Sequence, residues 1–166
     1  MGTVQNGIDM SESVENEYFC MTLLSALGIP AAKTEIVDFA GKKALAVERF
    51  DRQWTKDGRL LRLPQEDMCQ AMSIPPDTKY ESDGGAGMKR ILELLKGSDT
   101  PQEDQKTFLQ AQMLFWLLGA TDGHAKNFSI FLAPNGRYHL TPLYDVLSAQ
   151  PCFDAGQIRK NQMKLA

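Results

Sequence analysis

Apolar residues recur at helical spacing in three stretches of the chain. In the first, Ser11 or Ser13 provides a capping side chain for a helix that we expect to run to Leu27. The second, Met88–Leu95, is amphipathic, with its leucines and isoleucine on one side. The third, Phe108–Leu118, is apolar almost all round and predicts a buried helix.

Short runs rich in β-branched and aromatic residues predict strands between these helices. They form two expected antiparallel hairpins, Thr34–Phe39 with Ala44–Phe50 and Phe128–Leu132 with Tyr138–Leu140. We expect Gln53–Arg59 to be a polar connection and Glu66–Met72 to contain a short helix. Asp77–Gly87, rich in charge and glycine, predicts either a mobile loop beside a substrate or a solvated surface loop. The order of elements is that of an α+β protein.

Composition narrows the class of protein. A chain of 166 residues with 43% hydrophobic residues predicts one domain with its own core. A net charge of −3 argues against a general nucleic-acid or membrane surface, and no run of about 18 apolar residues is present. The three cysteines lack metal-ligand spacing and favour reduced thiols in a cytoplasmic protein.

The spacing of three polar residues predicts phosphotransfer chemistry. Asn127 follows Asp122 by five positions, as in the catalytic loop of a kinase, where the Asp accepts the proton of the attacking hydroxyl. Asp145 comes after the second hairpin, where a kinase carries its main magnesium ligand. Carboxylate and amide oxygens suit Mg²⁺, and Gly123 eases a tight turn after the Asp.

Each of these residues also has an ordinary structural interpretation. Asp and Asn are common turn residues, and an isolated pair at this spacing arises often by chance. A buried helix before the loop, and a hairpin and an acid after it, favour the catalytic interpretation. His124 and His139 lie on a loop and a strand at poor spacing for zinc. Asp51 and Asp67 are expected to form ion pairs with neighbouring arginines rather than to perform chemistry.

Several further stretches match one known family. They are Ser13–Cys20, Ala44–Arg52, Leu61–Gln70, Lys79–Gly85, the loop around Asp122 and Leu140–Asp145. Spread over about residues 10–150, they make the chain resemble the kinase core of the HipA family, the serine/threonine-kinase toxins of bacterial toxin–antitoxin pairs. The resemblance implies a protein-kinase-like core fragment: the lower N-lobe in about residues 10–50 and the front half of a mainly helical C-lobe in about residues 51–166, forming one partial domain over residues 1–166.

The resemblance also implies a role for each matching residue. It makes Asp122 the catalytic base and Glu17 the acid that pairs with a phosphate-binding lysine. The other implied contacts are with ATP and Mg²⁺: hinge contacts to adenine at Glu48 and Phe50, nucleotide-site positions at Gln65 and His124, and metal ligands at Asn127 and Asp145.

The sequence departs from that of a complete kinase in two respects. A kinase needs a loop that covers the nucleotide phosphates and a phosphate-binding lysine on a preceding strand. The sequence shows neither of them. Gly84–Gly87 is followed by Met88-Lys89 and fits no phosphate-loop pattern. We therefore expect a gene fragment, a truncated paralogue or a partial chain, inactive when isolated.

Two functions of different classes follow from the resemblance. The first is an ATP- and Mg²⁺-dependent serine/threonine kinase connected with persistence, with a HipB-like helix-turn-helix antitoxin as partner and a translation component such as glutamyl-tRNA synthetase as substrate. The second is a non-catalytic remnant that binds the antitoxin or a nucleotide. A small-molecule phosphotransferase of the aminoglycoside-kinase kind shares the Asp–Asn spacing, but the hinge match and the Pro64–Asp67 match count against it.

Overall fold

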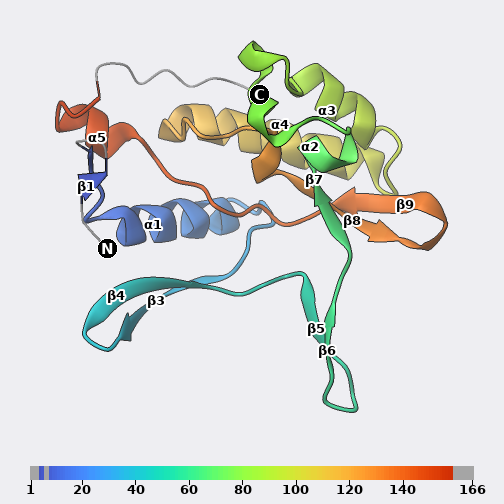
Figure 1. Cartoon of the computed structure of the whole chain (residues 1–166), viewed down its shortest axis with the longest axis horizontal. Coiled ribbons are helices and arrows are strands. Elements are labelled where there is room, and N and C mark those ends of the chain that lie inside the picture. Colours follow the sequence, from blue (N-terminus) through green and yellow to red (C-terminus); the bar gives the residue numbers. More distant parts are fainter. Residues whose placement is uncertain (1–3, 6–7, 159–166) are drawn as a thin grey trace.

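The computed structural model of the protein describes residues 4–5 and 8–158. Its helices lie together on one side of the molecule, and two hairpins project from the other (Figure 1). The α-helices are α1 (Ser13–Ala26), α2 (Met68–Ala71), α3 (Met88–Leu95), α4 (Pro101–Leu118) and α5 (Gln150–Asp154). Single 3₁₀ turns occur at η1 (Pro76–Thr78), η2 (Glu81–Asp83), η3 (Ala125–Asn127) and η4 (Pro134–Gly136).

All of the strands pair in antiparallel fashion. Three hairpins are formed by β1 (Val4–Gln5) with β2 (Ile8–Asp9), β3 (Thr34–Phe39) with β4 (Lys42–Val47), and β5 (Arg52–Trp54) with β6 (Leu60–Arg62). The fourth sheet has the order β7 (Gln65–Asp67), β8 (Ser129–Ala133) and β9 (Arg137–Leu140). This sheet brings a segment before α2 beside the strand that follows the expected catalytic loop.

The core lies where α1, α3 and α4 meet the β7–β9 sheet. Its largest fully buried side chains include three phenylalanines and several aliphatic residues, among them Phe108, Phe115, Phe128, Met21, Leu24, Ile91, Leu95, Leu143 and Val146. The rings of Phe108 and Phe128 meet edge to face, with their centroids 4.9 Å apart. Because Phe128 directly follows η3, this packing anchors the end of the loop to α4.

The predicted helix Met88–Leu95 and both predicted hairpins are confirmed. In the first hairpin Phe39 pairs with Lys42 across a two-residue turn, and both turn residues, Ala40 and Gly41, have positive φ. That geometry gives the twist that matches antiparallel strands. The mixture of helices and antiparallel strands confirms the α+β class.

Other predictions were wrong in detail. The stretch Gln53–Arg59 is not a mere connection, because β5 and β6 form a hairpin around Gly58, which has φ of 80°. The short helix begins only at Met68, after strand β7. The first helix begins after Glu12 without a side-chain cap, so neither serine plays that part.

Helix α4 is longer than predicted and is buried on one face only. Phe108 and Phe115 are enclosed, but an apolar stripe of four residues stays at least 42% exposed: Leu109, Met113, Trp116 and Leu117. Their spacing of four, seven and eight residues places them along one side of the helix. Sequence periodicity did not separate the two faces, because both are apolar.

Within the part of the chain that the structure describes, no helix has the length and apolar character needed to cross a membrane.

Candidate active site

The loop that carries Asp122 starts where α4 ends. Gly119 adopts the left-handed conformation, with φ of 62°, and the amide of Ala120 donates to the carbonyl of Phe115 over 2.8 Å. This is the pattern by which helices commonly end at glycine. A side chain at Gly123 would come within 2.5 Å of the Phe115 ring, so the turn after Asp122 requires glycine.

Asn127 closes the loop on itself. Its amide nitrogen donates to the carbonyl of Asp122 at 2.8 Å and lies 3.4 Å from the carbonyl of Asp145. Because both partners are acceptors, the amide oxygen is the atom left to face a cation. Asn127 is 6% exposed, so this orientation is held in a buried setting.

Asp145 is placed by the segment that follows β9. The amide of Leu143 donates to the carbonyl of Pro30, and the amide of Ala32 donates to the carbonyl of Leu143, both at 2.8 Å. Asp145 itself has φ of 58°, a left-handed conformation that costs a residue other than glycine about 1 kcal/mol or more. Aspartate tolerates that region better than most residues, and such conformations cluster at functional sites.

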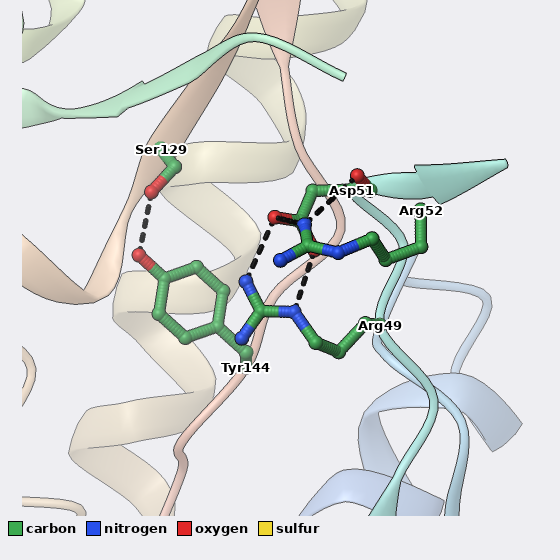
Figure 2. A network of polar contacts seen from close by, with 5 residues as sticks. All are labelled: Arg49, Asp51, Arg52, Ser129 and Tyr144. Atoms are coloured by element: carbon green, nitrogen blue, oxygen red, sulfur yellow. Dashed lines mark hydrogen bonds and ion pairs between the residues drawn. The ribbon is translucent and has the colours of Figure 1, made fainter. Parts of the chain in front are cut away.

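A hydroxyl network joins this segment to the loop. The Tyr144 hydroxyl donates to the carbonyl of Lys126 at 2.9 Å. It also lies 2.5 Å from the Ser129 hydroxyl (Figure 2). Burial raises the pKa of Tyr144 above its usual range, with Ser129 acting in the opposite direction. The ring of Phe50 packs on the Tyr144 ring at 5.7 Å. The predicted hinge is thus in contact with the residue next to Asp145.

Asp122, Asn127 and Asp145 line a common cavity of about 440 Å³. Glu17 of α1 lines it as well, and its pKa is raised, first by burial and then by the charge of Asp145. Two carboxylates that share a partly buried space favour an added cation. No lysine or arginine is among the described residues that line this cavity.

The side chains available to a metal in this cavity carry the type of ligand atom that Mg²⁺ prefers. Asn127 and Asp145 offer oxygen ligands, which this ion prefers. The described residues contain no cluster of three or more His, Cys, Asp or Glu side chains poised to hold a metal. Magnesium usually keeps several waters and completes its shell with substrate phosphates, so two protein ligands match a nucleotide-dependent site.

His124 is enclosed beside the Asp122 carboxylate. It is 5% exposed, its Nε2 lies 3.4 Å from Oδ1 of Asp122, and its Nδ1 has no partner among the described residues. Burial lowers the pKa of His124, although Asp122 opposes this shift. Burial of the ring therefore favours the neutral form of the imidazole.

The remaining predicted nucleotide contacts lie away from the cavity. Glu48 is exposed, and its amide donates to the carbonyl of Lys33 at 2.8 Å, so a main-chain contact with adenine would use its carbonyl oxygen. The Phe50 ring turns inward against Phe131 and Tyr144. Gln65 on β7 has a buried side-chain oxygen with no partner in the described part of the chain. Their predicted roles stay predictions.

A buried carboxylate, Asp51, pairs with two arginines beside the predicted hinge. The Arg49 guanidinium donates two hydrogen bonds to Asp51, at 2.8 and 2.7 Å, and Arg52 donates to the same carboxylate (Figure 2). Asp51 is 1% exposed, and these contacts lower its pKa to about 2, with the Arg49 hydrogen bond as the largest cause. The predicted pairing of Asp51 is confirmed. Asp67 instead caps α2 by accepting from the Gln70 amide at 2.8 Å.

Sequence reasoning assigned no role to Lys79 and Tyr80. The Tyr80 hydroxyl donates to Oδ1 of Asp122 at 2.7 Å, and the Lys79 amine lies 4.0 Å from the same oxygen. Tyr80 and Lys79 therefore bring the segment of residues 77–87 beside the loop. Whether this segment is mobile and meets a substrate stays a prediction. No local pattern could have indicated the contact, because 42 residues separate Tyr80 from Asp122.

Comparison with known proteins agrees with this geometry. The sequence profile of the HipA-like C-terminal domain matches residues 3–166. The chain belongs to this family. It is 42% identical over 137 residues to a candidate kinase, Y4mE, of Sinorhizobium fredii, and 35% identical over 147 residues to the serine/threonine-protein kinase toxin HipA of Shewanella oneidensis. These matches cover 82% and 81% of the chain but only 32% and 34% of the two relatives, so the chain spans about a third of their length.

Solved structures of HipA and of another kinase show the same fold. HipA of Shewanella oneidensis, in a complex with HipB and operator DNA, superposes with a TM-score of 0.85 at 31% identity, over 96% of this chain and 39% of that one. The Helicobacter pylori proinflammatory kinase CtkA gives a TM-score of 0.61 at 18% identity, over 87% and 48% of the two chains, and shows the fold alone. The HipA-type chain described here is therefore a kinase-like α+β fragment.

Proposed function

We propose that this HipA-family chain carries the catalytic-loop and metal-binding part of an ATP- and Mg²⁺-dependent serine/threonine protein kinase. The observation that supports it is the meeting of Asp122, Asn127 and Asp145 in one cavity, in a chain whose relatives include a serine/threonine-protein kinase toxin. Asp122 would accept the proton of the substrate hydroxyl, and Asn127 and Asp145 would hold the metal.

The family also guides the proposed biology. The solved HipA is bound to HipB, and we assign a HipB-like antitoxin to this chain as partner. A protein of the translation machinery, such as glutamyl-tRNA synthetase, is the proposed substrate. Bound Mg²⁺ would supply charge compensation for the transferred phosphoryl group. Glu48, Phe50, Gln65 and His124 would contact the nucleotide.

A second function is favoured by one observation. Because no lysine or arginine is among the described residues lining the cavity, the site contains less charge compensation for phosphate than a working kinase needs. The chain alone would then bind Mg²⁺-nucleotide or an antitoxin without turnover.

Isothermal calorimetry with ATP, in the presence and absence of Mg²⁺, tests the proposed site. We expect Mg²⁺-dependent binding that Asp145→Asn weakens at least tenfold, because the change removes a charged ligand. Asn tolerates the left-handed backbone at this position, so the fold should persist. Asp38→Asn, in the exposed β3 strand, is the matched control. Unchanged magnesium dependence in Asp145→Asn would remove Asp145 from the metal site.

A further inference from the structure

Three side chains converge on a single oxygen of Asp122. The Tyr80 hydroxyl lies 2.7 Å from Oδ1, His124 Nε2 lies 3.4 Å from it and the Lys79 amine lies 4.0 Å from it. The Asp122 side chain is otherwise open to solvent, with 62% of its surface exposed. The contacts that we describe for this carboxylate therefore all involve Oδ1. The other oxygen, Oδ2, is the one that we expect to accept from a substrate hydroxyl.

This convergence has a consequence for the conformation of Asp122. A solvent-exposed aspartate samples three staggered χ1 wells, and only one directs the carboxylate at a given point. A short hydrogen bond from a neutral donor to an ionised acceptor is stronger than one between neutral groups. Tyr80 therefore selects one well and holds the carboxylate in it.

Tyr80 is itself held by close packing. The Gly85 amide donates to the carbonyl of Tyr80 at 2.9 Å, and a Cβ at Gly85 would lie 2.1 Å from the Thr78 carbonyl oxygen and 2.7 Å from that of Tyr80. The Tyr80 ring meets the buried His124 ring edge to face at 5.2 Å, and the Lys79 amine lies 5.0 Å from the Tyr80 ring centroid. The Tyr80 hydroxyl is thus positioned by a backbone turn that requires glycine at position 85.

We propose that Tyr80 is a positioning residue for Asp122. Its hydroxyl binds Oδ1 and so directs Oδ2 toward the acceptor hydroxyl of the substrate. The inference rests on the proposed function, in which Asp122 is the base. It differs from a blocking contact, in which Tyr80 would occupy the place of the substrate and its removal would raise the rate.

Side-chain couplings of Asp122 test the positioning without any turnover. Three-bond NMR couplings from Asp122 Cγ to its backbone nitrogen and carbonyl carbon report the χ1 populations. We expect one rotamer in the unaltered chain and averaging over the three wells in Tyr80→Phe. The control is Tyr138→Phe, which removes another hydroxyl with a 2.7 Å bond, to the Leu94 carbonyl, and should leave Asp122 fixed. Averaging in the unaltered chain, or a fixed Asp122 in Tyr80→Phe, overturns the proposal.

Single-turnover phosphoryl transfer gives the second readout. Tyr80→Phe should lower the rate constant about threefold, the factor lost when one of three wells is no longer selected. The concentration of Mg²⁺-ATP that gives half the maximal rate constant should not change. A rate that rises in Tyr80→Phe overturns the proposal, because Tyr80 would then block the base. Absence of transfer by the unaltered chain would favour the second proposed function, binding without turnover, and the couplings would still decide the role of Tyr80.

Discussion

The buried carboxylate of Asp51 gives a stability prediction that does not depend on any activity. Asp51→Asn keeps the size of the side chain but removes the charge that Arg49 and Arg52 share. The folded-state pKa of Asp51 is about 2, against an ordinary value of 3.8. At about 1.4 kcal/mol per pKa unit, the ionised carboxylate stabilises the fold by about 2 kcal/mol.

The sign of the pH dependence follows from the lowered pKa. The contribution is fully present above the ordinary pKa near 4 and is lost as the pH falls toward 2. Urea unfolding followed by far-ultraviolet circular dichroism should therefore show a free-energy difference between the two proteins of about 2 kcal/mol at pH 7 and about half that at pH 3. The midpoint of thermal unfolding at pH 7 should fall by about 4–8 °C in Asp51→Asn.

Asp57→Asn is the matched control for this experiment. Asp57 also accepts a hydrogen bond from an arginine, Arg59 at 2.8 Å, but its side chain is 59% exposed. Solvent screens such a pair, so the control should change stability little at either pH. An Asp51→Asn difference that is equal at pH 7 and pH 3, or no larger than that of the control, would refute the reasoning.

Two further substitutions test the loop. Asp122→Asn should abolish phosphoryl transfer in a protein that performs it, because the base is lost with almost no change in volume; retained turnover at an unchanged melting temperature would contradict the assignment. Tyr144→Phe should lower the free energy of unfolding by about 1–3 kcal/mol, because the buried Ser129 hydroxyl and the Lys126 carbonyl lose their partner. Urea unfolding measures this effect, and stability equal to that of the unaltered chain would show that the network is dispensable.

The sequence predicted the helices and hairpins whose signals are local. Met88–Leu95 carries an unambiguous apolar face, and Asn135-Gly136 is a strong turn signal. The Asp57-Gly58 pair carries a similar signal, but the polar residues around it led to the prediction of a connection where β5 and β6 pair. The predicted loop residues Asp122 and Asn127 and the more distant Asp145 do meet in one cavity.

Local sequence patterns did not predict the contacts between residues far apart in the chain. Tyr80 reaches Asp122 only because tertiary packing brings residues 77–87 to the loop, and neither residue's neighbours indicate this. The predicted ion pairing of Asp67 failed because a helix begins immediately after it, and capping the Gln70 amide satisfies its carboxylate. Which face of α4 is buried also depends on which other segments pack against it. The spacing of apolar residues within the helix does not indicate this.

Because both tryptophans are exposed, their fluorescence can report contact of another molecule with the surface of the protein. Trp54 on β5 is 69% exposed and Trp116 on α4 is 64% exposed, and the sequence contains no third tryptophan. Unfolding changes the surroundings of these indoles little, so their fluorescence is a poor measure of folding. Any molecule that covers the β5–β6 hairpin or the outer face of α4 would shift the emission to shorter wavelength. Replacing either tryptophan with phenylalanine would then tell which of the two surfaces is in contact.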